Sequence, residues 1–280
     1  MDTEQQQIKR KGDKMLKVAL IGLGGMGSVH LANWRKMEGV ELVAVCDIRS
    51  DLAVEKAVNE KVYADIDELL EHETLDIVDV CTPSYLHKEH SIKAMKKGIH
   101  VLTEKPAALN SEDVAEMYRI AKDNHVKLMV AHVIRFMKDY MVLKEFYKSK
   151  KYGELLQGHF WRLSATPKWS WNNWMLDESK SGLVPYDLHI HDCDFIYSLL
   201  GKPNECHVTR SKVKENTYPD HYIAQYEYNN AGQYNKKNDE RAIKIIVAII
   251  IAAVTFPIWS GILGVIIGIV FGLGGTIIGL

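Results

Sequence analysis

Cysteine is scarce in this 280-residue chain, and its four cysteines include no CxxC pair. Disulfide-framed secreted domains and cysteine-based zinc sites need more cysteines at closer spacing, so the sequence excludes both classes. The four are Cys46, Cys81, Cys193 and Cys206. We expect reduced thiols in a cytosolic domain and no bound metal.

An excess of either charge is also absent, because 35 basic and 36 acidic side chains leave a net charge of −1. Proteins that attract nucleic acid by bulk electrostatics carry a clear positive excess, so we expect no nucleic-acid partner. Residues 1–14 lack the apolar core of a signal peptide and are rich in glutamine and charge. We predict a disordered tail there.

Charge is missing altogether from residues 245–280. The apolar stretch 242–280 exceeds the roughly 20 residues that one straight span needs, so we predict a membrane-spanning helix, long and tilted, or a tight helical hairpin. Its glycines recur every four residues, which lets helices approach closely in lipid. Basic residues of a polar linker over 230–241 place the rest of the chain in the cytoplasm and this segment in the inner or plasma membrane.

The strongest positive signal is the stretch from Met15 to Asp47, whose order is strand, glycine turn, helix, strand, acid. The turn has the sequence Gly22-Leu23-Gly24-Gly25-Met26-Gly27. Gly22 permits a tight turn, Gly24 leaves the backbone open to a pyrophosphate, and Gly27 lets the helix lie close to the strand. The free N–H groups of the helix N-terminus then favour phosphate. A plain glycine turn is the alternative.

Asp47 follows the second apolar run, 20 residues after Gly27. Its carboxylate can accept hydrogen bonds from the ribose hydroxyls of NAD, and its charge would repel the 2′-phosphate of NADP. Arg49 keeps NADP open as an alternative, because a guanidinium binds phosphate. We therefore expect NAD as the cofactor.

Apolar runs and helical segments alternate throughout residues 15–133. The runs are short and almost continuously apolar, as strands buried on both faces are. This alternation predicts an α/β fold, in which residues 15–133 form an NAD(P)-binding Rossmann domain with a doubly wound parallel sheet. The predicted strands are Leu16–Ile21, Glu41–Cys46, Asp76–Thr82, Ile99–Thr103 and Val126–Val133.

Ligands bind at the edge where the parallel strands of such a sheet end. Two further sequences fall at that edge, Thr82-Pro83 and Glu104-Lys105-Pro106. The Lys105 ammonium can point into the nicotinamide crevice from a strand end. A surface lysine in a turn is the alternative.

Residues 134–229 have an α+β pattern. Asp187 and His191 are four residues apart on one predicted helix, so they share a face. A carboxylate beside an imidazole can hold a hydroxyl group and move its proton, and a polar helix face with a cap interaction is the alternative. The predicted elements are helices over Met137–Lys148 and Pro185–Gly201, and strands over Gly153–Ser164, Glu205–Val213 and Tyr222–Tyr228.

Tryptophans crowd one segment of this second part, namely Trp161, Trp169, Trp171 and Trp174. Aromatic clusters more often pack a small core or an interface than bind a ligand. Stacking against a sugar ring is the alternative.

The glycine turn, the Glu104-Lys105-Pro106 sequence and the Asp187-x-x-x-His191 sequence occur in this order. Together they resemble the glucose–fructose oxidoreductase, inositol dehydrogenase and rhizopine-catabolism family (Gfo/Idh/MocA), over about Met15 to Tyr228. The resemblance implies hydride transfer between a sugar or cyclitol hydroxyl and NAD, with Lys105, Asp187 and His191 as the catalytic group. It implies further that residues 134–229 form a partial α+β substrate-binding domain.

The resemblance also implies that the end of the third predicted strand lies beside the nicotinamide, followed by a family histidine that corresponds to His87. The expected cofactor-binding residues are Gly22, Gly24, Gly25, Met26, Gly27, Asp47, Arg49, Thr82, Pro83, His87, Glu104 and Lys105.

The chain departs from the family after Asn229-Asn230, where the sheet signal stops. Family members continue through a large, mostly antiparallel sheet that backs the substrate pocket and often forms a dimer interface. We therefore expect a truncated member with an unrelated tail. It is either a membrane-anchored NAD(P)-dependent dehydrogenase of sugars or polyols, with homo-oligomers left open, or a non-catalytic dinucleotide-binding membrane protein or inactive fusion product.

Overall fold

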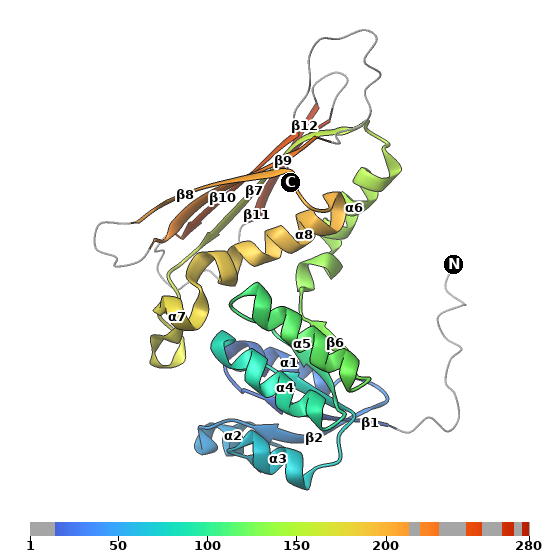
Figure 1. Cartoon of the computed structure of the whole chain (residues 1–280), viewed down its shortest axis with the longest axis vertical. Helices are drawn as coiled ribbons and strands as arrows, with labels where there is room; N and C mark the ends of the chain where they lie inside the picture. The colour runs from blue at the N-terminus through green and yellow to red at the C-terminus, as the bar shows by residue number, and fades with distance from the viewer. Residues whose placement is uncertain (1–14, 213–218, 230–244, 254–264, 272–275, 280) are drawn as a thin grey trace. The chain divides into compact units, whose positions relative to one another are not determined.

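The computed structural model describes residues 15–212, 219–229, 245–253, 265–271 and 276–279, the last three ranges as backbone only. The chain divides into two compact units, Met1–Ala131 and His132–Leu280. Figure 1 shows a sheet with helices against it in each unit. The predicted tail over 1–14 and the predicted linker over 230–241 lie outside the described residues.

Six parallel strands form the sheet of the first unit. They are β1 (Leu16–Ile21), β2 (Val40–Cys46), β3 (Lys61–Tyr63), β4 (Ile77–Val80), β5 (His100–Thr103) and β6 (Leu128–Val130). Their order is β3-β2-β1-β4-β5-β6, which is that of a doubly wound dinucleotide-binding fold, so the predicted Rossmann architecture is confirmed. The order reverses between β1 and β4, and ligands bind such sheets where these strands end.

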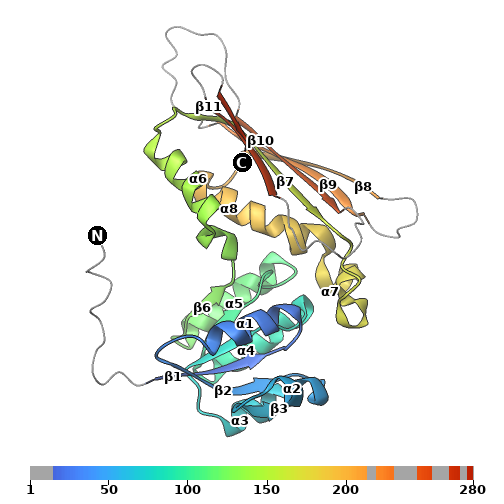
Figure 2. The same cartoon turned by 180° about the vertical axis from the view of Figure 1, so that it is seen from behind.

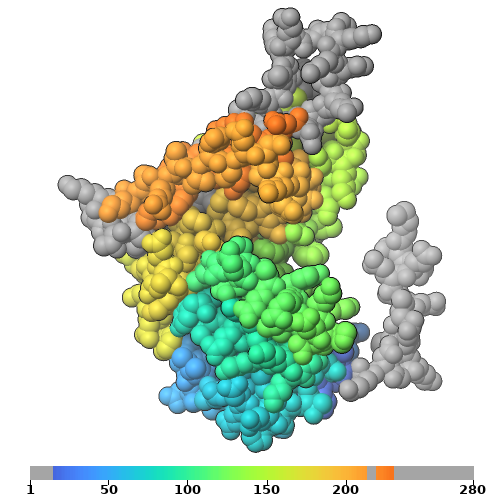
Figure 3. Space-filling view, viewed as in Figure 1, coloured from blue at the N-terminus to red at the C-terminus, as the bar shows by residue number. Residues whose placement is uncertain are grey.

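Helices cover both faces of this sheet. They are α1 (Gly25–Trp34), α2 (Ser50–Lys56), α3 (Ile66–His72), α4 (His87–Lys96) and α5 (Ser111–Asp123). Ala19 and Ile21 of β1 pack with residues of α3, α4 and α5, whereas Leu20 packs with Leu31 of α1 and Ala53 of α2. In Figure 3 the atoms of α4 and α5, coloured teal to green, cover one face of the unit. Burial on both faces explains why the strands are almost wholly apolar.

Five of these strands agree with the predicted strands, whereas β3 was not predicted. Three residues, Lys61–Tyr63, are too few to show a strand period. The helical segment after β4 begins as a 3₁₀ turn, η1 (Ser84–Leu86), and continues as α4. The missed strand β3 lies at the edge of the sheet, so the predicted doubly wound topology is unchanged.

The second unit contains a six-stranded mixed sheet in the order β12-β11-β7-β10-β9-β8. The strands are β7 (Leu155–Ser164), β8 (Glu205–Ser211), β9 (His221–Tyr228), β10 (Ile245–Ala253), β11 (Val265–Phe271) and β12 (Thr276–Gly279). β7 and β10 are parallel, and the other neighbours are antiparallel.

Helices lie along one face of this mixed sheet, as Figures 1 and 2 both show. The principal ones are α6 (Lys138–Ser149) and α8 (Ile190–Leu200), with α7 (Glu178–Ser181) before α8 and the 3₁₀ segments η2 (Val133–Phe136) and η3 (Trp171–Leu176). Tyr140 and Leu143 of α6 meet Phe195 of α8, Phe160 of β7 and Tyr228 of β9 in one buried core. The packing of these helices explains the apolar positions of the second part.

The C-terminal stretch corrects the sequence analysis. We expected a helix or helical hairpin over 242–280, but 245–253, 265–271 and 276–279 are the strands β10, β11 and β12. β10 and β11 pair with β7 on its two sides, so they extend the sheet that we expected to stop at residue 229. Short apolar runs rich in Ile and Val suit a buried strand as well as a helix.

The membrane-spanning helix expected over 242–280 is not observed in the described part of that segment, which consists of strands. Within the described part of the chain, no helix combines the length and the apolar character that crossing a bilayer requires. The parts of 242–280 between the three strands lie outside the described residues.

A buried ion pair ties α8 to the sheet of the second unit. The Arg162 guanidinium on β7 donates to both carboxylate oxygens of Asp192 on α8, at 3.0 and 2.8 Å. It also donates to the Tyr140 hydroxyl on α6 at 3.2 Å. The two charged side chains are only 6% and 1% exposed, so their charges depend on each other. This contact holds one face of α8 against the sheet.

We predict that Asp192→Ala destabilises the chain by about 3–5 kcal/mol, because it leaves the buried guanidinium without a counter-charge. Urea unfolding, followed by tryptophan fluorescence, measures the change. The control Glu154→Ala removes an exposed partner of Lys150 and should cost less than about 1 kcal/mol. The double variant Arg162→Met/Asp192→Leu should recover most of the loss, and equal losses in Asp192→Ala and Glu154→Ala would contradict the interpretation.

Candidate functional site

The glycine turn connects the carboxyl end of β1 directly to α1. Gly22 has a φ of +89°, and a Cβ there would lie 2.6 Å from the Cys81 carbonyl oxygen, so only glycine fits. A Cβ on Gly27 would lie 1.9 Å from the Gly22 carbonyl oxygen. Around a Cβ on Gly24, in contrast, nothing lies within 4 Å. This open space at the N-terminus of α1 suits a pyrophosphate.

Gly25 and Met26 form the first turn of α1, and both are exposed. The first backbone N–H groups of a helix have no partner within the helix, so this exposed end is compatible with phosphate binding by Gly25 and Met26, which stays a prediction.

Asp47 follows β2 and is buried, with 6% of its surface exposed. One carboxylate oxygen accepts the Leu23 N–H of the glycine turn at 2.8 Å. The Arg49 guanidinium donates to both oxygens, at 2.8 and 2.7 Å. Burial would raise the pKa of Asp47, but the hydrogen bonds from Arg49 and Leu23 outweigh it and lower that pKa. Asp47 is therefore an ionised acceptor beside the turn.

Backbone hydrogen bonds continue the sheet beyond the strand ends and align the predicted site residues of the first unit. Gly22 N–H donates to the Cys46 carbonyl, Cys81 N–H to Ile21, and Glu104 N–H to Val80, at 2.7, 2.7 and 2.8 Å. The glycine turn, Asp47, Thr82-Pro83 and Glu104-Lys105 consequently lie along one edge of the sheet. This is the edge at which a dinucleotide binds.

Lys105 is half-buried at the end of β5, and Glu104 beside it is buried. The Lys105 backbone N–H donates to Oε2 of Glu104 at 3.0 Å. Burial would raise the pKa of Glu104, but its hydrogen bond with His30 and the Lys105 charge lower it. The Glu104 carboxylate is thus turned toward protein groups, and a direct contact with a cofactor stays a prediction.

His87 is 1% exposed. Its ring nitrogens lie 2.7 Å from the carbonyl oxygens of Pro106 and Thr82. The ring links the loops that follow β4 and β5, the two strands whose ends flank the expected nicotinamide half. A role of His87 in cofactor binding stays a prediction, and this geometry would make that role indirect.

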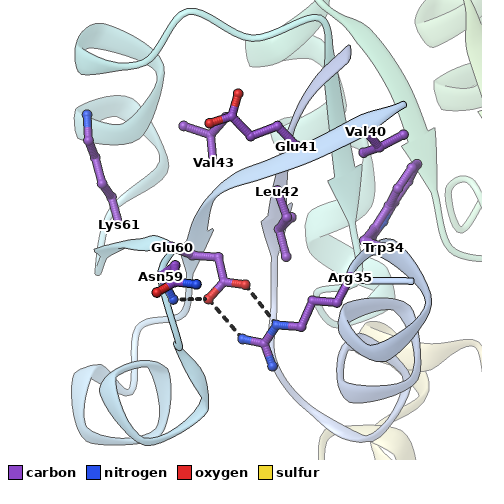
Figure 4. A pocket seen from close by; sticks show the side chains of 9 residues that line it. All are labelled: Trp34, Arg35, Val40, Glu41, Leu42, Val43, Asn59, Glu60 and Lys61. Atoms are coloured by element: carbon purple, nitrogen blue, oxygen red, sulfur yellow. Dashed lines mark hydrogen bonds and ion pairs between the residues drawn. The ribbon is translucent and has the colours of Figure 1, made fainter. Parts of the chain in front are cut away.

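A pocket of about 370 Å³ lies elsewhere on the first unit, near the amino end of β2 (Figure 4). Arg35 and Glu60 form a two-point ion pair within it, at 2.8 and 2.9 Å. Because dinucleotides bind at the carboxyl ends of the strands, this pocket is not the predicted cofactor site. Its lining residues are Trp34, Arg35, Val40, Glu41, Leu42, Val43, Asn59, Glu60 and Lys61.

Asp187 and His191 belong to the second unit, and both are half-buried. The predicted single helix is divided there: a π-helical turn, η4 (Pro185–His189), precedes α8. Asp187 lies inside this wide turn and His191 is the second residue of α8. Single π turns inside helices occur frequently at functional sites, so the local geometry agrees with a functional role for this pair.

Neighbouring polar residues of α8 and η4 have structural partners. His189 lies 2.7 Å from the Tyr226 hydroxyl on β9 and stacks on that ring, and burial lowers its pKa to about 4. Asp194 accepts two hydrogen bonds from Arg135, both of 2.5 Å. These contacts, together with Arg162 on Asp192, anchor the helix on both sides of His191.

The tryptophan cluster does not form a buried core in the described residues. Trp161, Trp169 and Trp171 are 41%, 68% and 42% exposed. The expectation of a small packed core is wrong for these three side chains. An interface and sugar stacking both remain predictions.

His30 of α1 and Asp79 of β4 were not among the predicted site residues. Asp79 is completely buried and contacts His30, which in turn contacts Glu104. A carboxylate inside an otherwise apolar strand was the available signal, because a buried charge needs a partner.

Family models match both units of the chain. Residues 16–132 match the model described as the oxidoreductase family, NAD-binding Rossmann fold, and residues 140–235 match the GFO/IDH/MocA C-terminal domain. The chain belongs to the Gfo/Idh/MocA oxidoreductase family. Its first unit is an NAD-binding Rossmann domain.

Three relatives are each 32% identical to this chain. They are the 2,7-anhydro-N-acetylneuraminate hydratase of Mediterraneibacter gnavus, the myo-inositol 2-dehydrogenase of Thermotoga maritima and the D-glucoside 3-dehydrogenase of Escherichia coli. The matches cover 71%, 68% and 67% of this chain and 54%, 56% and 55% of the relatives. The chain therefore spans about half the length of the relatives it matches.

Solved structures share the fold. The myo-inositol 2-dehydrogenase of Lactobacillus plantarum has a TM-score of 0.79 at 22% identity and covers 95% of this chain and 76% of its own. The WlbA dehydrogenase of Bordetella pertussis was solved with NADH and UDP-GlcNAcA. It has a TM-score of 0.80 at 19% identity, and the match covers 95% of this chain and 74% of that structure's chain. At these identities the likeness establishes the fold alone.

We predict opposite defects for two alanine variants of the glycine turn. Gly27→Ala places a methyl group against the Gly22 carbonyl and should cost at least about 3 kcal/mol of unfolding free energy. Gly24→Ala should leave stability within about 1 kcal/mol, because its φ of −65° suits alanine. Its methyl group would fill the pyrophosphate approach, so NAD affinity should fall at least about tenfold. Calorimetric titration measures NAD affinity, and thermal unfolding measures stability. Wild-type NAD affinity in Gly24→Ala would refute the approach of the pyrophosphate at Gly24.

We predict that Asp47→Ala binds NAD about 10- to 100-fold more weakly, since it removes a charged hydrogen-bond acceptor, and discriminates less against NADP. Asp47→Asn serves as the matched variant, because its amide oxygen can still accept the Leu23 N–H. It should fold normally and also lose discrimination. Titration of both cofactors gives the ratio of the two dissociation constants, and an unchanged ratio in both variants would remove Asp47 from cofactor selection.

Proposed function

We propose that this chain is an NAD-dependent dehydrogenase that oxidises or reduces a sugar or cyclitol at a carbinol carbon. The observation that carries this proposal is the placement of Lys105 on the same sheet edge as the glycine turn and Asp47. An ammonium at that edge could donate a hydrogen bond to the oxygen of a substrate beside the nicotinamide.

Residues on the two sides of the point between β1 and β4, where the strand order reverses, would bind different parts of the cofactor. The glycine turn and α1 would hold the pyrophosphate, and Asp47 would accept the ribose hydroxyls on the β2 side. Thr82-Pro83 and Lys105 would border the nicotinamide on the β4–β5 side. When bound, the nicotinamide supplies a hydride acceptor or donor.

Proton movement is assigned to the second unit. The His191 imidazole would take the hydroxyl proton during oxidation and return it during reduction, since an imidazole titrates near neutral pH. Asp187 would orient the substrate and support the charge on His191. Lys105 would donate a hydrogen bond to the reacting oxygen and stabilise its developing charge. NADP in place of NAD is the alternative that the Arg49 guanidinium allows.

The names of the relatives support a polyhydroxylated substrate. The T. maritima and E. coli relatives are named as dehydrogenases of myo-inositol and of a glucoside. The exposed side chains of Trp169 and Trp171 are suitable for stacking on such a ring. A relative named as a hydratase indicates a second outcome, a reaction without net change in NAD.

We predict that Lys105→Ala and His191→Ala each lower turnover about 10²- to 10⁴-fold. This is the range expected on loss of a group that stabilises a developing charge or transfers a proton. The assay incubates the chain with NAD and a panel of inositols and sugars. It follows NADH formation and substrate consumption separately, so that a redox-neutral reaction is also detected. Lys122→Ala and His72→Ala change exposed residues outside the site and should retain full activity.

NAD binding without consumption of any substrate would replace this proposal with a dinucleotide-binding protein that lacks catalysis. Equal activity of the wild type and Lys105→Ala would remove Lys105 from the reaction.

A further inference from the structure

A cluster of charged side chains lies inside the first unit, beneath the edge that carries the cofactor site. The His30 ring comes from α1, Asp79 from the middle of β4 and Glu104 from the end of β5. His30 Nδ1 lies 2.8 Å from Asp79 Oδ2, and His30 Nε2 lies 3.1 Å from Glu104 Oε1. The three side chains are 12%, 0% and 8% exposed. The ring therefore bridges two buried carboxylates.

Both ring nitrogens face carboxylate oxygens, which accept hydrogen bonds, so the arrangement favours a ring that is protonated on both nitrogens. Burial alone would lower the pKa of His30, but the hydrogen bonds and negative charges of Asp79 and Glu104 raise it to about 10. The ring is consequently an imidazolium at neutral pH. A single positive charge is shared between two acids.

Other groups complete the cluster without changing this charge. The Trp34 indole N–H donates to the same Asp79 oxygen as His30, at 2.5 Å. The Cys81 thiol lies 3.6 Å from the other Asp79 oxygen, and burial and the Asp79 charge raise its pKa, so the thiol stays neutral. The Lys105 charge also lowers the pKa of Glu104.

Atoms of His30, Asp79 and Cys81 lie within 4.8 Å of one another, a spacing that a metal ion would accept. The two His30 nitrogens already hold hydrogen bonds to carboxylates, so protons occupy the positions that a metal would need. We assign no metal to this cluster.

The cluster connects two parts of the proposed active site. His30 lies on the helix that begins at the glycine turn and would receive the cofactor phosphates. Glu104 uses its first carboxylate oxygen for His30 and its second for the backbone N–H of Lys105. A continuous path of hydrogen bonds thus runs from α1 to the peptide that carries the Lys105 side chain.

We propose that His30 is a positioning residue, which fixes Glu104 and through it the Lys105 backbone relative to the cofactor-binding helix. The expected effect on turnover rests on the proposed function for the role of Lys105. The hydrogen-bonded path from His30 through Glu104 to the Lys105 backbone does not. Glutamine in place of either His30 or Glu104 breaks the path. Its neutral amide cannot supply the positive charge of His30, and its single carbonyl oxygen cannot replace the two acceptor oxygens that Glu104 uses.

The test compares the full-length wild type, His30→Gln, Glu104→Gln and the double variant. Each single variant should lower kcat about 10- to 100-fold through displacement of Lys105, with little change in NAD affinity. Because both act on one path, the double variant should be no slower than the slower single variant. The control His72→Gln changes an exposed histidine of α3 and should behave as wild type.

Two nuclear magnetic resonance readouts do not depend on turnover. Both His30 nitrogens should be protonated in the wild type at pH 8. Exchange of the Lys105 amide hydrogen should accelerate at least about tenfold in His30→Gln, while Val101 inside β5 keeps its wild-type rate. If no panel substrate reacts, the proposed function fails, and these measurements still decide the role of His30. A neutral His30 ring, an unchanged Lys105 exchange rate, or additive losses in the double variant would overturn the proposal.

Stability should also depend on pH through His30. Its pKa is about 10 in the folded chain against an ordinary 6.5, so its contribution is complete below about pH 6.5 and disappears as the pH rises through 10. The difference in melting temperature between wild type and His30→Gln should therefore shrink between these values. A constant difference would count against an imidazolium at this position.

Discussion

The first unit depends on one close contact between two backbones, that of α1 and that of the turn after β1. Glycine at position 27 allows this approach, since an added methyl group there would lie 1.9 Å from the Gly22 carbonyl oxygen. The approach sets the position of the whole helix. His30 and Trp34, farther along α1, can reach Asp79 in β4 only because the helix begins so near the sheet.

Local sequence carries most of the information for the Rossmann unit. Apolar strands, the glycine turn and Asp47 are close in the chain, so their spacing alone predicts the order of elements and the edge where NAD binds. The link from His30 to Asp79 joins residues 49 positions apart. Nothing in the spacing indicates which helix supplies the partner of a buried acid, although Asp79 itself signals that a partner exists.

The second unit shows where sequence reasoning reaches its limit. The runs 245–253 and 265–271 are uniformly apolar, and a helix in lipid and a strand in the middle of a sheet have the same composition. What distinguishes them is the pairing of β10 and β11 with the two sides of β7, more than 80 positions earlier in the chain. Family members continue here through a mostly antiparallel sheet, but the apolar composition led us to expect an unrelated tail in its place.

The buried pair of Arg162 and Asp192 determines how α8 is rotated about its own axis, and His191 is the residue next to Asp192. The exposed segment that contains Trp169 and Trp171 does not include either residue of this ion pair. Under the proposed function, substitutions in that segment would change which substrates the second unit binds without turning His191 away. If the proposed function holds, this fold separates the choice of substrate from the proton chemistry, so relatives can diversify in the first while retaining the second.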